Sequence, residues 1–238
     1  MALFNEWLIF SLILLAFWIL IFIFRKGLRK EMFFVSLFTM PLGLTEPLFV
    51  PEYWNPPSLF NLAAKTGFDI ESLIFSFAIG GIASVIYESI FNVKYRRMNV
   101  HEMHGKRHRY HLLALYSPLI IIILLLLFTN LNPIYSAIIA MFMGGFAAAI
   151  CRPDLKKKTL AGGILFLALY FIGFLFFTMI YPYAVETFWN LSAISGVLIF
   201  GIPLEELLFA FSLGMLWTNV YEHALGYRII KTRNRFQK

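Results

Sequence analysis

Two adjacent glutamates, Glu205 and Glu206, lie inside an otherwise apolar run from Leu191 to Leu216. A carboxylate near the centre of a bilayer costs at least about 2.5 to 3.5 kcal/mol, so acids in such a run are candidates for function. Pro203 is expected in the first turn of a helix, where its missing N–H costs nothing, and both acids then follow in that turn. Burial and a neighbouring carboxylate both favour the neutral acid, so this pair could donate a proton.

Two further glutamates are expected at the same end of the molecule. Glu71 opens a predicted helix from Ile70 to Phe91, and Glu46 lies towards the outer end of another predicted helix. Glu71 could instead be an N-terminal acid that the helix dipole favours at the membrane edge. Glu88 and Glu222 lie at the opposite helix ends beside basic loops, where we expect salt bridges rather than chemistry.

The composition indicates an integral membrane protein, because 60% of the 238 residues are hydrophobic and only 14% are charged. Seven stretches are long enough to cross a bilayer as helices. The second of them contains two prolines and is expected to be kinked. The seven predicted spans are Trp7 to Phe24, Met32 to Val50, Ile70 to Phe91, Leu112 to Phe128, Pro133 to Ile150, Thr159 to Ile180 and Pro203 to Leu225.

The positive charges support this arrangement, since 19 of the 20 Lys and Arg residues fall in alternate loops or in the C-terminal tail. The positive-inside rule assigns those segments to the cytoplasm, which predicts a multi-pass cell membrane protein with its N-terminus outside and its C-terminus inside. The net charge of +7 then needs no nucleic-acid partner. The first apolar run is predicted to be a retained anchor. A single cysteine, Cys151, excludes an intrachain disulfide framework.

An internal repeat suggests the architecture. Residues 71–88 align with residues 205–222 with seven identities in eighteen pairs, and the pairs Trp54-Asn55 and Trp189-Asn190 extend the correspondence upstream. We therefore predict an all-α membrane fold of two parallel three-helix repeats joined by a linking transmembrane helix. The predicted units are residues 1–110, 111–131 and 132–238.

The segments before the two equivalent helices, Trp54 to Asp69 and Trp189 to Ile202, are apolar but interrupted by proline or glycine. Irregular backbone at membrane depth must be buried in protein or line a cavity. Because the helices that follow are equivalent, Glu71 and Glu205 are expected at matching depths. A shared central site is therefore predicted, and Glu46 could join it.

Other chemistries receive little support from the sequence. His101, His104, His108 and His111 cluster at helical spacing, but their loop is strongly basic, so a surface loop is expected and no metal site is predicted. Neither a Gly-x-Gly-x-x-Gly fingerprint nor a Walker loop occurs, so no nucleotide or flavin cofactor is expected.

With these motifs the chain resembles the membrane-embedded, non-flavin lycopene cyclases, in the fused form of the heterodimeric bacterial type. The resemblance lies in Pro203-Leu204-Glu205-Glu206, in Glu46-Pro47 through Pro51-Glu52-Tyr53-Trp54-Asn55-Pro56, and in the duplication. One departure is that Ser72 stands in the first repeat where the second has Glu206. The two halves therefore cannot be chemically equivalent.

The resemblance implies a carotenoid cyclase acting on lycopene from the lipid phase. An acid protonates the polyene end, a six-membered ring closes through a carbocation, and a lost proton leaves a β or ε ring without net redox change. The implied acids are Glu206, Glu205, Glu71 and Glu46, with Glu206 favoured as the donor. Aromatic faces stabilise cations, and the implied substrate-binding residues are Trp217, Phe209, Phe211, Phe75, Phe77, Trp54 and Trp189. Carotenoid-pathway enzymes or a second copy of the chain are possible partners.

Two other classes stay open at this stage. A proton-coupled transporter would also use duplicated bundles and intramembrane acids, but it would move a substrate without changing it. A non-catalytic carotenoid-binding membrane protein would need the aromatic residues and tolerate loss of the acids.

Overall fold

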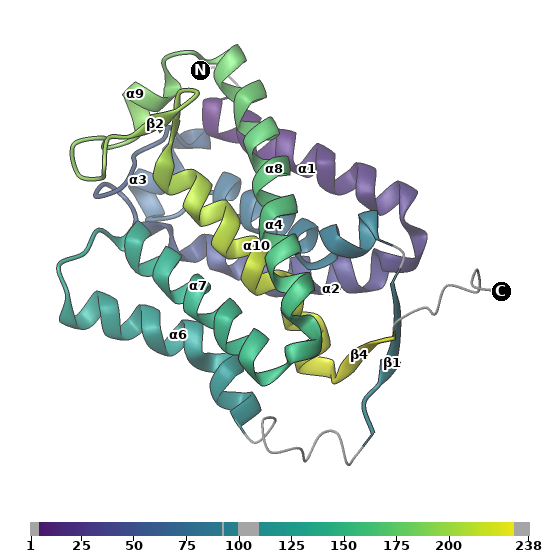
Figure 1. Ribbon diagram of the computed structural model, residues 1–238. Helices are drawn as coiled ribbons and strands as arrows, with labels where there is room; N and C mark the ends of the chain where they lie inside the picture. Colours follow the sequence, from purple (N-terminus) through teal and green to yellow (C-terminus); the bar gives the residue numbers. More distant parts are fainter. Residues whose placement is uncertain (1–4, 92, 100–109, 231–238) are drawn as a thin grey trace.

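The computed structural model describes residues 5–91, 93–99 and 110–230, and these residues are mostly helical (Figure 1). Its α-helices are α1 (Glu6–Phe24), α2 (Arg29–Thr39), α3 (Leu62–Thr66), α4 (Ile70–Ile90), α6 (His111–Phe128), α7 (Pro133–Cys151), α8 (Lys156–Ile180), α9 (Ala184–Phe188) and α10 (Leu204–Leu225). Short 3₁₀ helices are η1 (Lys26–Leu28), η2 (Met40–Leu48), η3 (Leu59–Asn61) and η5 (Pro153–Leu155). Two antiparallel pairs join β1 (Lys94–Arg97) to β4 (Tyr227–Ile230) and β2 (Leu198–Ile199) to β3 (Ile202–Pro203).

Five helical segments of the described chain are long and apolar enough to cross a membrane, which is compatible with a membrane-embedded protein. Helix α6 shows this most clearly, because Ala114 is its only buried residue and many of its large apolar side chains are exposed. The five segments are Glu6–Phe24, Ile70–Ile90, His111–Phe128, Pro133–Cys151 and Pro153–Ile180. The specific membrane and the orientation of the termini stay predictions.

The other two predicted spans, Met32 to Val50 and Pro203 to Leu225, do not satisfy the same criterion. The first is broken, as its prolines predicted: α2 has 11 residues and continues as the nine-residue 3₁₀ helix η2, which contains Pro41 and Pro47. The second corresponds to α10, which has 22 residues but carries three glutamates. That these two segments also cross the membrane, which would give seven spans in total, therefore stays a prediction.

Helices α4 and α10 pack against each other and run in the same direction (Figure 1). Both begin at the end where Trp54 and Trp189 form a backbone bridge, and both end just before the paired strands β1 and β4. The hydroxyl of Thr218 on α10 donates to the carbonyl of Ala83 on α4 at 2.8 Å. These two helices therefore hold Glu71 and Glu205 at the same end of the molecule.

Four other helices form two groups around this pair, α1 and α2 against α4, and α7 and α8 against α10, while α6 packs on the outside of α7. Glycines at equivalent positions of the predicted repeat allow other helices to approach α4 and α10 closely. A Cβ atom on Gly80 would lie 2.1 Å from Oγ1 of Thr39 in α2, and one on Gly214 would lie 2.7 Å from the carbonyl oxygen of Gly162 in α8. The arrangement fits the predicted duplication, but the repeat and the three predicted units stay predictions.

The irregular segments before α4 and α10 are joined to each other. Asn55 N–H donates to the Phe188 carbonyl at 2.7 Å, and Asn190 N–H donates to the Tyr53 carbonyl at 2.9 Å. These two bonds satisfy backbone N–H and C=O groups that lie outside helices and therefore have no partner within their own segment. They also place Tyr53 and Trp189 side by side above the first turn of α10.

Helix α10 begins one residue later than predicted. Pro203 is its N-cap rather than a first-turn residue, because Ile202–Pro203 pairs with Leu198–Ile199 as strands β3 and β2. Gly201 provides the tight turn between those strands with a φ of +79°, a conformation that glycine adopts without strain. Glu205 and Glu206 still lie in the first turn of the helix.

Candidate active site

The Glu206 carboxylate is buried and accepts three hydrogen bonds from side chains of three separate segments. The Tyr53 hydroxyl lies 2.6 Å from Oε1, and the Trp189 indole N–H lies 3.0 Å from the same oxygen. The Tyr170 hydroxyl lies 2.5 Å from Oε2. Tyr53 follows η2, Tyr170 lies in the middle of α8, and Trp189 follows α9. The fold therefore fixes both carboxylate oxygens from outside their own helix.

The tyrosines of this cluster are suited to remain neutral donors. Burial, and next the nearby Glu206 carboxylate, raise the pKa of the Tyr53 phenol well above its ordinary value. Trp189 is donor only, and its indole nitrogen also lies 3.2 Å from the Tyr53 hydroxyl. A hydroxyl can donate or accept a hydrogen bond, so either tyrosine can turn to accept a hydrogen bond from the O–H of a protonated Glu206.

Aromatic rings enclose this carboxyl group. The Tyr170 ring packs edge-on against Phe10 at 5.6 Å between centroids and lies 6.4 Å from Phe209. Phe75 of α4 and Phe209 of α10 stack at 6.5 Å, and these two residues are equivalent in the predicted repeat. Several π faces are therefore present next to Tyr170, which is one of the three donors to Glu206.

The neighbouring Glu205 carboxylate belongs to a different set of contacts. Its Oε1 accepts from the Tyr135 hydroxyl at 2.7 Å and from the Ser195 N–H at 2.9 Å. Consecutive residues of a helix project about 100° apart, so two adjacent acids do not point into one pocket. The two carboxylates therefore share no hydrogen-bond donor among the described residues, and their predicted cooperation stays a prediction.

Glu71 is held in a way that resembles Glu205. Its Oε1 accepts from the Asn5 side-chain amide at 2.6 Å and from the Leu59 N–H at 2.7 Å. In both acids the other oxygen is buried without a hydrogen-bond partner among the described residues. Both carboxylates therefore tie an irregular segment to the first turn of its helix.

Glu46 lies beside a second buried acid at the same end. Its Oε2 accepts from the N–H of Asp69 at 3.0 Å, and its Oε1 is buried without a described partner. Burial, together with nearby Glu71, raises the pKa of the Asp69 carboxyl. A cavity of about 620 Å³ is lined by Glu46 and also by Asn55, Asn61 and Phe188. Of the four predicted acids, Glu46 alone lines this cavity.

The predicted aromatic residues divide into two groups. Phe75, Phe209 and Trp189 surround the Glu206 cluster, and Trp54 packs on Trp189 at 5.4 Å. The other three pack elsewhere: Trp217 against Phe38, Phe77 against Trp18 and Phe33, and Phe211 against Phe142.

Sequence reasoning missed both tyrosines of the Glu206 cluster. Tyr53 lies in a segment that carries the family resemblance, but no role was predicted for it, and it is only 3% exposed. Tyr170 is a single phenol within a long apolar run, and a buried phenol normally requires a polar partner, which is the signal that could have found it. His101, His104 and His108 lie outside the described residues.

A second buried polar cluster lies at the opposite ends of α4 and α10. Lys158 is fully buried and forms ion pairs with Glu88 and with Glu222, the latter at 2.6 Å. The Tyr95 hydroxyl donates to Glu88, and burial raises the pKa of that phenol. The expected salt bridges of Glu88 and Glu222 are thus confirmed.

One family model matches this chain, and its description is lycopene cyclase. The match covers residues 132–224, which include Glu205, Glu206, Tyr170 and Trp189. It confirms the predicted resemblance over this part of the chain and supports a role in carotenoid cyclisation. No curated protein and no solved structure gives a significant match.

Proposed function

We propose that this chain, whose residues 132–224 resemble lycopene cyclases, closes β- or ε-ionone rings at the ends of lycopene by acid catalysis. The observation that carries the proposal is the Glu206 carboxyl group, which is buried among aromatic rings and bonded to Tyr53, Tyr170 and Trp189. The match to the family model covers three of these four residues.

The proposed reaction begins with transfer of a proton from Glu206 to the terminal alkene of the polyene. The carboxylate that forms is the group which the two tyrosines and the indole stabilise, and such donors are most effective when they are already in place. The next double bond of the polyene then attacks the carbocation, and the new carbon–carbon bond closes a six-membered ring. Loss of one proton from the ring then restores neutrality, and the Glu206 carboxylate is the base that accepts it.

The aromatic rings have a separate task in this scheme. A cation over the face of an aromatic ring is stabilised by about 0.5 to 2 kcal/mol or more, depending on desolvation. Phe75, Phe209 and Phe10 lie around Tyr170 and can present their faces to the developing charge. The number of protons is unchanged and no electrons are transferred, so the scheme uses no flavin or nicotinamide.

Glu46 is the alternative proton donor, because it lines the 620 Å³ cavity at the same end of the molecule. We favour Glu206 because its carboxylate has donors on both oxygens and aromatic neighbours, which suit an acid that must lose a proton next to a carbocation. Glu71 and Glu205 are proposed to position the irregular segments.

Expression of the full chain in bacteria that accumulate lycopene tests the activity. We expect a new carotenoid of the same mass as lycopene, with a different retention and the absorption spectrum of a ring-bearing polyene. The purified protein in lipid or detergent should carry out the same conversion without added cofactor. Unchanged lycopene in both assays, or a strict need for reduced flavin, would contradict the proposal.

Replacing Tyr170 with phenylalanine should slow the reaction without abolishing it. The variant loses the 2.5 Å bond to Oε2 of Glu206 but keeps the two donors on Oε1. A hydrogen bond to a charged group contributes about 1.5 to 3 kcal/mol, which corresponds to a loss of roughly 10- to 150-fold in turnover.

Tyr135→Phe is the matched control, since it removes the corresponding hydroxyl from Glu205. Turnover of lycopene per membrane-inserted chain is the measurement. A larger loss in Tyr135→Phe than in Tyr170→Phe would move the catalytic role from Glu206 to Glu205.

A further inference from the structure

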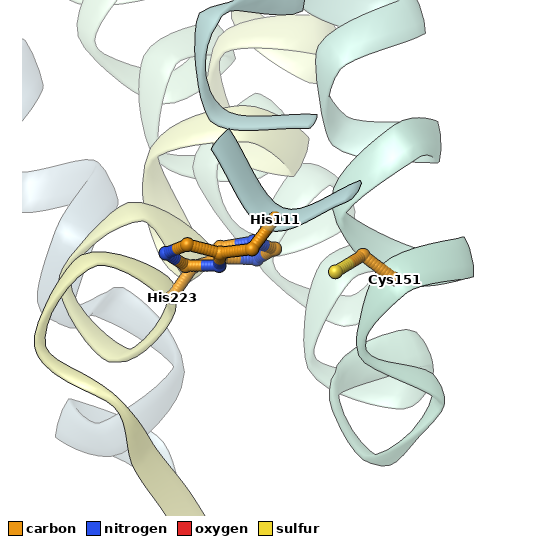
Figure 2. Close-up of side chains that lie close together, drawn as sticks. All are labelled: His111, Cys151 and His223. Atoms are coloured by element: carbon orange, nitrogen blue, oxygen red, sulfur yellow. The ribbon is translucent and has the colours of Figure 1, made fainter. Parts of the chain in front are cut away.

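Three metal-ligating side chains from three helices meet at the end of the molecule opposite Glu206. They are His111, the first residue of α6, Cys151, the last residue of α7, and His223, in the last turn of α10. One donor atom of each lies within 4.8 Å of the donor atoms of the other two. Figure 2 shows the two imidazole rings lying over each other, with the Cys151 sulfur directed towards them.

These side chains are packed rather than spread over a surface. Cys151 is 7% exposed, His223 is 2% exposed and His111 is partly buried. The two rings are stacked with centroids 4.4 Å apart and an angle of 10° between their planes. Basic loops predict that this end faces the cytoplasm, where thiols stay reduced and available as ligands.

We propose that His111, Cys151 and His223 form a transition-metal site whose expected occupant is Zn²⁺. Imidazole nitrogen and thiolate sulfur are the ligands that Zn²⁺ prefers, and three protein ligands leave a fourth tetrahedral position for water or another donor. Bond lengths of about 2.0 to 2.3 Å place such ligands about 3.3 to 3.6 Å apart. The donor atoms lie within 4.8 Å of one another, so they need to approach by at most about 1.2 to 1.5 Å, and rotation of one imidazole brings its nitrogen towards the other two ligands.

The sequence did not predict this site, because it grouped His111 with the loop histidines His101, His104 and His108. Its partners here come from positions 151 and 223, which only the packing of α6 and α10 against α7 brings near. The site is separate from the proposed reaction, since His223 and Glu206 are 17 residues apart on α10, or about 25 Å along its axis. A bound metal ion would link the start of α6 to the ends of α7 and α10 and stabilise this end of the bundle.

Metal binding by the full-length protein in detergent tests the proposal. After removal of metal with a chelator, Zn²⁺ is titrated in competition with a chromophoric chelator, and Co²⁺ is added separately as a spectroscopic probe. We expect one Zn²⁺ per chain and a thiolate-to-cobalt charge-transfer band from Cys151. Because changes beyond the direct ligands already cost about 10- to 100-fold in affinity, Cys151→Ser and His223→Gln should each lose at least that much.

The matched control replaces His101, His104 and His108 together with glutamine. If the proposal is right, this variant keeps the stoichiometry, the affinity and the cobalt band. Loss of binding in the control with full binding in Cys151→Ser would assign the metal to the loop histidines and overturn the proposal. A wild-type protein that binds no Zn²⁺ or Co²⁺, while still folded by circular dichroism, would overturn it as well.

Discussion

Replacing Glu206 with glutamine is expected to reduce lycopene cyclisation by about 10²- to 10⁴-fold, the usual contribution of a positioned general acid. The substitution removes the transferable proton and keeps the shape of the side chain. Turnover is measured as ring-bearing carotenoid formed per membrane-inserted chain, with the amount of protein matched by immunoblot.

The contacts of Glu206 explain why this variant should still fold. The amide oxygen of glutamine can take the place of Oε1 and accept from Tyr53 and Trp189. The amide NH₂ can take the place of Oε2 and donate to the Tyr170 hydroxyl, which accepts as readily as it donates. A loss of activity would therefore report the missing proton rather than a collapsed site.

Glu205→Gln is the closest control, because it changes the adjacent residue and touches a separate set of partners. We expect it to lose much less activity than Glu206→Gln. If Glu206→Gln kept turnover near that of the wild type while Glu46→Gln lost it, the proton would come from the acid that lines the cavity. That result would overturn the assignment of Glu206 and leave the proposed reaction in place.

The sequence was sufficient to predict a mostly helical chain with long apolar helices and the place of Glu206 in the first turn of α10. Long apolar runs set the positions of the helices, and Pro203 marked the start of α10 to within one residue. The break in the second predicted span also followed from local residues, Pro41 and Pro47, because proline in a helix interior removes a backbone hydrogen bond and its ring clashes with the preceding turn.

The partners of Glu206 could not be predicted in the same way. Tyr53 precedes it by 153 residues and Tyr170 by 36, so each contact depends on how distant segments pack. Helices such as α1 are apolar on all sides, and the usual helical period then does not reveal which side is buried. For the same reason the sequence could not show that Trp217, Phe77 and Phe211 pack away from the Glu206 cluster.

The position of Lys158 shows a related limit of charge counting. Its neighbours Lys156 and Lys157 are exposed, as expected in a basic loop. Lys158, one residue further along α8, is fully buried between Glu88 of α4 and Glu222 of α10. The two glutamates are equivalent in the predicted repeat. Lys158 was counted among the basic residues that predict the orientation in the membrane. In the structure it links the ends of α4 and α10.

Replacing Lys158 with methionine is expected to destabilise the protein by about 3 to 5 kcal/mol, the usual effect of removing one partner of a buried ion pair. Methionine fills a similar volume but leaves the Glu88 and Glu222 carboxylates buried without their cation. Equilibrium unfolding in mixed micelles measures the change. Lys157→Met is the matched control on the same turn, and because its side chain is exposed it should change the stability by less than about 1 kcal/mol.

A combined variant separates lost charge pairing from lost packing. If the penalty comes from the two unpaired carboxylates, adding Glu88→Gln and Glu222→Gln to Lys158→Met should restore most of the lost stability, because neutral amides cost less to bury than charges. The three changes share partners, so their effects should be strongly non-additive. Additive losses, or a Lys158→Met variant as stable as Lys157→Met, would show that the buried lysine does not hold the ends of α4 and α10 together.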